Sequence, residues 1–255
     1  MICDAHAWIG HWPFQSLPER TATGLLRQMD RNGIDKALVG NLNGLLYKDA
    51  HEANHELARE VRRHRDRLVP CAAINPTYSC WREDLQQCRD DFGMPVLRLV
   101  PDYHGYKLTE KAAEELVAEA HALKMTPAIV WRVVDPRGRH PLDPGREARD
   151  ADVLGLVNKF PKASFLMLNF RGVPGGHRMD KPACYFDITQ FMGRNGLRME
   201  EEIRKYGADR FVFGSGMLLR YGKPARIGLD ACRLTKAQRE AIHWRNLSRM
   251  VKELR

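Results

Sequence analysis

Several features that mark whole classes of protein are missing from this chain of 255 residues. No stretch approaches the roughly 18 consecutive apolar residues of a membrane-spanning helix. The start carries no basic flank followed by an apolar run of signal-peptide length. The six cysteines form no C-x-x-C pair and no compact secreted framework, so we expect reduced thiols. These absences predict a cytoplasmic protein that does not bind a membrane.

Acidic residues are fewer than basic ones, which leaves a net charge of +9 and a pI near 9.4. A nucleic-acid-binding surface would gather lysine and arginine beside stacking aromatic residues. Here the basic residues are spread along the helical segments instead, so we expect no nucleic-acid partner. A basic surface of this kind favours small anionic ligands.

Short apolar runs alternate with amphipathic segments of helical period along the whole chain. The runs that predict strands lie at 2–6, 37–39, 68–74, 96–100, 127–131, 165–168, 185–188 and 211–213. The segments that predict helices lie at 23–32, 50–63, 81–92, 109–124, 150–160, 199–206 and 235–254. This α/β pattern predicts a single (β/α)8 TIM barrel over residues 1–255. A doubly wound open sheet is the alternative, but no G-x-G-x-x-G follows the first strand to support its dinucleotide-binding form.

In such a barrel the active site lies at the carboxyl ends of the strands. Polar and aromatic residues occupy those ends, and we expect substrate or catalytic contacts from His6, Trp8, Asn75, Arg98, Arg132, Asn169 and Asp187. His104 follows the fourth strand in a glycine-containing turn, where it could line the mouth of the barrel.

Two connecting segments, 10–18 and 132–149, are longer than a barrel needs, and long structured loops are usually functional or disordered. Within the second, Asp135, Arg137 and His140 could supply a carboxylate, an anion clamp and a proton carrier. The alternative for this loop is a solvated surface with local ion pairs. Trp12, Phe14 and Tyr47 could line the pocket or form a contact between subunits of a homo-oligomer.

One short motif imitates a zinc protease. The stretch from His51 to His55 reads H-E-x-x-H, in which both histidines would bind zinc and Glu52 would act as the base. On a helix, however, both histidines flank the apolar stripe and are expected to face solvent on the outside of the barrel. No further histidine completes the longer form of the motif, so we do not expect zinc-protease chemistry.

The ordered segments resemble the amidohydrolase-related TIM-barrel family, which includes metal-dependent hydrolases and decarboxylases related to aminocarboxymuconate semialdehyde decarboxylase. The resemblance lies in ICDAHAWIG, GIDKALVGN, RLVPCAAINP, MPVLRLVPDYHGYKL, DRFVFGSG and LTKAQREAIHWRNLSRM, which follow one another along nearly the whole chain. It implies a barrel of this family with its active site at the strand ends.

The same resemblance identifies where the family binds its divalent metal, and most of those positions differ here. His6 matches the first ligand, but the other positions hold Trp8, Trp131 or Arg132, Asn169 and Gly216. A catalytic zinc normally needs about three protein ligands. We therefore expect no family-type metal centre, and a metal such as zinc only through a re-sited ligand set, for instance His6 with His104, Asp135 and His140.

Three functions remain compatible with the sequence. The first is an enzyme, a hydrolase by resemblance or else a decarboxylase, in which arginines hold a small polar or anionic substrate. Its acid–base groups would be His6, Asp135, His140 or Asp187, and Arg98, Arg132 and Arg137 would bind the anion. The second is a hydrolase with the re-sited metal. The third is a non-catalytic barrel that binds a small molecule or a partner protein, in which the 132–149 loop would be exposed and disordered instead of closing over a polar pocket.

Overall fold

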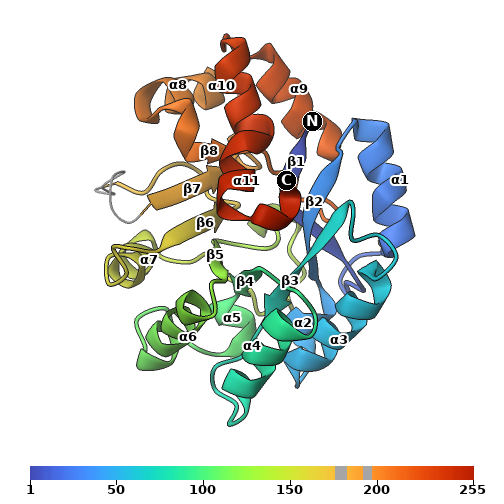
Figure 1. Ribbon diagram of the computed structural model, residues 1–255, viewed down its shortest axis with the longest axis vertical. Coiled ribbons are helices and arrows are strands. Elements are labelled where there is room, and N and C mark those ends of the chain that lie inside the picture. The colour runs from blue at the N-terminus through green and yellow to red at the C-terminus, as the bar shows by residue number, and fades with distance from the viewer. Residues whose placement is uncertain (176–182, 192–196) are drawn as a thin grey trace.

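The strands form one parallel sheet that curves around a central axis, with helices on the outside (Figure 1). The computed structural model describes residues 1–175, 183–191 and 197–255. In this part of the chain eight strands lie side by side in chain order: β1 (Cys3–Ile9), β2 (Lys36–Asn41), β3 (Leu68–Ala73), β4 (Val96–Leu99), β5 (Thr126–Val130), β6 (Ser164–Leu168), β7 (Ala183–Asp187) and β8 (Phe211–Val212).

The sheet closes because the segment that follows β8 returns to β1. The backbone N–H of Ala5 donates to the carbonyl of Phe213 at 2.9 Å, and that of Gly216 donates to the carbonyl of His6 at 2.8 Å. Side chains reinforce this seam, since the buried carboxylate of Asp4 accepts from both the backbone N–H and the hydroxyl of Ser215. The fold is therefore the predicted (β/α)8 barrel and not an open doubly wound sheet.

Helices cover the outer face of the barrel. Eight of those in the described residues lie within or close to the predicted segments: α1 (Ala22–Asn32), α3 (Ala50–Val61), α4 (Trp81–Asp90), α6 (Lys111–Ala122), α7 (Asp150–Val157), α8 (Leu197–Tyr206), α10 (Lys236–Glu240) and α11 (Asn246–Met250). The sequence pattern missed α2 (Asn43–Leu46), α5 (Pro101–His104) and α9 (Gly222–Ala231). None of the helices in the described residues is both long and apolar enough to span a bilayer.

Two layers of apolar side chains fill the fold. Inside the barrel, side chains from alternate strand positions pack together, among them Ala5, Trp8, Leu38, Val130 and Leu166. A second layer lies between the strands and the surrounding helices. Because both faces of each strand are buried, the strands read as the nearly continuous apolar runs that identified them in the sequence.

Mutation of Ser215 tests its hydrogen bond to Asp4. Ser215→Ala leaves one buried carboxylate oxygen of Asp4 without its hydroxyl donor, which should lower the free energy of unfolding by about 1–3 kcal/mol. Urea unfolding followed by circular dichroism measures the difference. The matched control is Ser16→Ala, at an exposed serine, which should stay within about 0.5 kcal/mol of the parent protein. Equal destabilisation by both changes would contradict the role given to this bond.

Candidate functional site

A histidine and a carboxylate meet at the carboxyl end of the barrel. The Nδ1 atom of His6, on β1, lies 2.8 Å from Oδ2 of Asp187, the last residue of β7. The side chains are 3% and 0% exposed, so the pair is almost completely removed from water. Within the described residues the Nε2 atom of His6 has no hydrogen-bond partner. The ring is therefore fixed at one nitrogen and available at the other.

The Asp187 carboxylate is held by three further hydrogen bonds. The backbone N–H groups of Asn169 and Thr189 donate to Oδ1 at 3.0 and 3.3 Å, and the Thr189 hydroxyl donates to Oδ2 at 2.9 Å. Asn169 reaches this position with a φ of 63°, a left-handed conformation that asparagine tolerates better than most residues. These donors allow a carboxylate to remain buried, because a buried charge needs hydrogen-bond partners.

Beside His6, a buried arginine stacks on a tryptophan. The guanidinium of Arg98 lies 4.2 Å from the centre of the Trp8 ring, and it donates to the backbone carbonyls of Ala7 and Leu38 at 3.0 Å each. These two hydrogen bonds connect β4 to β1 and β2. Burial lowers the pKa of Arg98 from its ordinary value, although nearby groups, Cys71 first and then Asp4, act in the opposite direction. The structure thus places Arg98 in the barrel framework, where backbone acceptors use its two terminal nitrogens.

A second group of charges surrounds the carboxyl end of β5. Arg132 is 4% exposed and donates to Glu147 at 2.6 Å and to Asp135 at 3.4 Å. Arg171 also donates to Glu147, at 2.9 Å. Asp135 in turn accepts from Arg137, and this hydrogen bond holds the pKa of the Asp135 carboxyl well below its usual range. Asp135 is therefore a poor proton carrier near neutral pH and a good structural anion.

Arg220 is a cation that forms no ion pair among the described residues of this region. It lies in the segment after β8, its side-chain carbons cover Gly216, and it is partly buried. Within the described residues its guanidinium forms no ion pair and no hydrogen bond. Burial lowers the pKa of Arg220 and the positive charge of the neighbouring Arg132 lowers it further, while the carboxylates of Asp135 and Asp187 act in the opposite direction. The guanidinium lines a cavity of about 500 Å³, together with Gln15, Val133, Val134, Asp135, Arg137, Gly138 and Leu219.

The 132–149 loop packs onto the barrel. Asp143 is 2% exposed and accepts hydrogen bonds from the Tyr103 hydroxyl at 3.0 Å and the Gly145 N–H at 2.9 Å. Tyr103 packs edge-on against Trp12 of the first long loop. The first part of the loop lines one side of the cavity beside Arg220, whereas many of its residues from 136 to 149 are exposed.

Three residues expected at the site lie apart from the His6 network. Asn75 accepts from the backbone and hydroxyl of Thr77 within its own turn. His104 is buried between two backbone carbonyls, with Nε2 at 2.8 Å from Gly44 and Nδ1 at 3.3 Å from Ile74. His140 is exposed and stacks on Phe14.

The network joins the remaining expected residues through contacts between neighbours, in the order Arg98, Trp8, His6, Asp187, Asn169, Arg132, Asp135 and Arg137. The sequence analysis did not single out Arg220, Thr189 or Gln190, whose amide donates to Asn169. The signal for Thr189 was its place two residues after Asp187. Arg220 could have been found only by treating the loop after the eighth strand as part of the barrel mouth.

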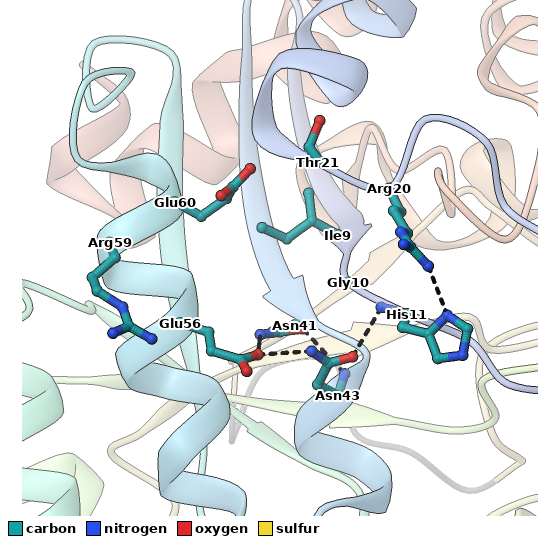
Figure 2. Close-up of a pocket in the computed structure, with 10 residues that line it drawn as sticks. All are labelled: Ile9, Gly10, His11, Arg20, Thr21, Asn41, Asn43, Glu56, Arg59 and Glu60. Carbon is teal, nitrogen blue, oxygen red and sulfur yellow. Dashed lines mark hydrogen bonds between the residues drawn. The ribbon is translucent and has the colours of Figure 1, made fainter.

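A larger cavity of about 630 Å³ lies to one side of the mouth (Figure 2). We call it the lateral pocket; its lining residues are Ile9, Gly10, His11, Arg20, Thr21, Asn41, Asn43, Glu56, Arg59 and Glu60. One wall is α3, and the other is the loop between β1 and α1. It contains none of the residues of the His6 network.

The H-E-x-x-H helix is confirmed as α3, but one expectation about it is wrong. His51 is buried, not solvent-facing, because α4 packs against it: its Nε2 atom lies 2.8 Å from Oε1 of Gln87, and its ring stacks on Phe92. In the described part of the chain, no cluster of three or more His, Cys, Asp or Glu side chains could hold a metal there or elsewhere.

Comparison with solved structures identifies the type of barrel. A 2,6-dihydroxybenzoate decarboxylase from Rhizobium is 17% identical with a TM-score of 0.74, covering 98% of each chain. A candidate amidohydrolase from Staphylococcus aureus is 12% identical with a TM-score of 0.76, covering 98% of this chain and 99% of the other. The fold is that of the amidohydrolase-like barrels. No protein-family model and no curated protein matches the sequence.

One similar structure raises the question of a metal. A dihydroxybenzoic acid decarboxylase from Polaromonas, 15% identical with a TM-score of 0.74 and covering 100% of this chain and 97% of that one, was solved with bound manganese. In this chain the described residues around His6 offer two donor side chains, His6 and Asp187. Asn169 is already committed to Arg132 and Gln190, and Gly216 has no side chain. This donor set does not fit a three-ligand ion, and the re-sited set with His104 and His140 is not brought together.

The burial of His104 predicts a pH dependence of stability. Burial lowers the pKa of His104 below 6.5, and this effect exceeds the opposing influence of the Gly44 and Ile74 carbonyls. Below about pH 6.5 the unfolded chain therefore binds a proton more readily than the folded one, so stability falls as the pH falls from 6.5 toward the pKa of the folded state. His104→Gln should remove about 1 kcal/mol of the loss between pH 7.5 and 5.5.

Urea unfolding at both pH values measures this loss, with His140→Gln as the control at an exposed histidine. The control should show the same pH dependence as the parent protein. Parallel pH profiles for the parent protein and His104→Gln would contradict the prediction.

Proposed function

We propose that this protein is an acid–base hydrolase of a small carboxylate-bearing ester or lactone, with His6 as the proton carrier. The observation that carries the proposal is the buried pair of His6 and Asp187, whose ring has one free nitrogen at the catalytic end of the barrel. A carboxylate that holds Nδ1 of a histidine fixes its tautomer and leaves Nε2 to exchange protons with a reacting group.

Arg220 indicates that the substrate carries a carboxylate. Its guanidinium forms no ion pair or hydrogen bond among the described residues, and Arg220 lines the cavity above the strand ends. Guanidinium groups bind carboxylates through two parallel hydrogen bonds. A carboxylate of the substrate would supply the missing anion and would offset the repulsion between Arg220 and Arg132. The net positive charge of the chain favours the same class of ligand.

The proposed step uses groups of this chain and one water molecule. Nε2 of His6 takes a proton from water while the water oxygen bonds to the carbonyl carbon of the substrate. The bond from that carbon to the leaving oxygen then breaks, and the imidazolium returns its proton to the leaving oxygen. Asp187 stabilises the positive charge that His6 carries between the two transfers.

Decarboxylation is the second candidate, supported by the decarboxylases of dihydroxybenzoate that share the fold. In that reaction the bond to the carboxylate carbon would break, carbon dioxide would leave, and His6 would donate its proton to the carbon that remains. The two candidates differ in product, since only decarboxylation releases carbon dioxide. We propose that the ligands of this protein are small molecules and that it has no nucleic-acid partner.

Variants of His6 and Arg220 test the proposal with two esters, 4-acetoxybenzoate and the uncharged phenyl acetate. His6→Gln should lower kcat for 4-acetoxybenzoate by roughly 10²- to 10⁴-fold. Arg220→Gln should raise KM for 4-acetoxybenzoate by roughly 10- to 100-fold and leave KM for phenyl acetate unchanged, because only the first ester carries a carboxylate. Arg249→Gln, at an exposed arginine of α11, serves as the control.

Full activity in His6→Gln would overturn the assignment of the proton carrier. An equal rise in KM for both esters in Arg220→Gln would overturn the assignment of the carboxylate site. If 2,6-dihydroxybenzoate yields carbon dioxide while neither ester is cleaved, the protein is a decarboxylase and not a hydrolase. Circular dichroism confirms that each variant is folded.

A further inference from the structure

The lateral pocket combines charges of both signs that do not neutralise one another. Arg20 and Arg59 line it with Glu56 and Glu60, yet among the described residues none of these four side chains forms an ion pair. Elsewhere in this chain, exposed charges of opposite sign do form ion pairs, as Arg67 does with Asp30 at 2.7 Å. Here the local structure keeps the charges apart around an open space.

Hydrogen bonds hold the two carboxylates on the α3 side. Glu56 accepts from the side-chain amides of Asn41 and Asn43 at 3.1 and 2.7 Å, and from the Tyr47 hydroxyl at 3.1 Å. Glu60 accepts from the backbone N–H of Ala22 at 2.9 Å through Oε1, which leaves its Oε2 atom free. The neutral donors fix each carboxylate without cancelling its charge.

The opposite wall positions a cation. Arg20 lies in the loop between β1 and α1, and its guanidinium is 3.0 Å from Nδ1 of His11 (Figure 2). The backbone N–H of His11 donates to Oδ1 of Asn43 at 2.9 Å, which joins this wall to the floor of the pocket. The second cation, Arg59, comes from α3 and has no acceptor in the described structure.

The floor is built closely enough to define the pocket. Gly10 has a φ of 99°, and a Cβ atom there would lie 2.2 Å from Oδ1 of Asn41. That oxygen also accepts from the backbone N–H of Asn43 at 3.1 Å. Only glycine allows the loop to approach the end of β2 this closely. The backbone therefore fixes the floor of the pocket, and the exposed side chains of Arg20, Arg59 and Glu60 extend from the elements that surround it.

From these charges we infer that the lateral pocket binds a small zwitterion, a molecule with one ammonium and one carboxylate group. A simple anion would be attracted by Arg20 and Arg59 but repelled by Glu56 and Glu60, and a simple cation would meet the opposite balance. A zwitterion places each of its charges near the opposite one. The inference is independent of the proposed reaction, because the pocket shares no residue with the His6 network.

Thermal unfolding with named probes tests the inference. Glycine, β-alanine and 4-aminobutanoate carry the same two charges at increasing separation, so at least one of them should raise the Tm. A ligand at ten times its Kd should raise it by about 3–5 °C. N-acetylglycine carries only the carboxylate and glycinamide only the ammonium, and each should raise the Tm by less than a third as much.

Matched variants locate the binding. Arg59→Gln and Glu60→Gln should each lower the affinity for the best zwitterion by roughly 10-fold or more, and the glutamine of the second can still accept from Ala22. The controls Arg63→Gln and Glu52→Gln change the same residue types at exposed positions outside the pocket and should retain the affinity.

Three results would overturn the inference: equal stabilisation by N-acetylglycine or glycinamide, no stabilisation by any of the three zwitterions, or retained affinity in Arg59→Gln and Glu60→Gln. Each leaves the esterase test of His6 unaffected, so failure of the lateral pocket and failure of the proposed reaction are distinguishable.

Discussion

The buried carboxylate of Asp187 is the constraint on which the mouth of the barrel depends. With no exposure to water it must find its hydrogen-bond donors within the protein. It finds them at the end of β6, in the turn after β7 and on β1, so Asn169, Thr189 and His6 are all drawn toward one group. The left-handed conformation of Asn169 and the orientation of the His6 ring follow from this requirement. A metal ion would organise a barrel mouth by collecting ligands, and here a carboxylate does so by collecting donors.

Other buried charges are also held by partners within the protein. Arg98 donates to backbone carbonyls, Asp4 accepts from Ser215, and Arg132 is paired with Glu147. Each of these groups has partners within the fold and contributes to the framework, although the Nε atoms of Arg98 and Arg132 have no hydrogen-bond partner among the described residues. Arg220 is partly buried beside another cation and has no acceptor among the described residues. A charge that costs desolvation without a partner is explained best by an interaction with a molecule that binds there.

The sequence predicted the barrel because every strand is buried on both faces, and such runs are visible without tertiary information. It missed α2 and α5 because helices of four residues carry no period, and α9 because the segment begins at Gly222 and contains Pro224. Candidate residues at the strand ends could be named from the sequence because the strands themselves could be located. The burial of His51 was not predicted, because it results from packing against α4. The periodicity of a helix does not reveal which neighbour packs on its flank. Arg220 depends on where a loop returns after β8, which no local pattern encodes.

The loop between β1 and α1 contributes residues to both the lateral pocket and the cavity beside Arg220. His11 and Arg20 form one wall of the lateral pocket, whereas Gln15 lines the cavity that contains Arg220. In the same loop Trp12 is 2% exposed and packs against Phe14 and Tyr103, and it lines a further cavity of about 630 Å³ formed by the loop itself. The surroundings also differ in charge. Two arginines, Arg137 and Arg220, line the cavity beside Arg220 together with Asp135. The lateral pocket is lined by two arginines and two glutamates that form no ion pairs among the described residues. If both proposals are correct, the first loop contributes to two binding sites that have no lining residue in common.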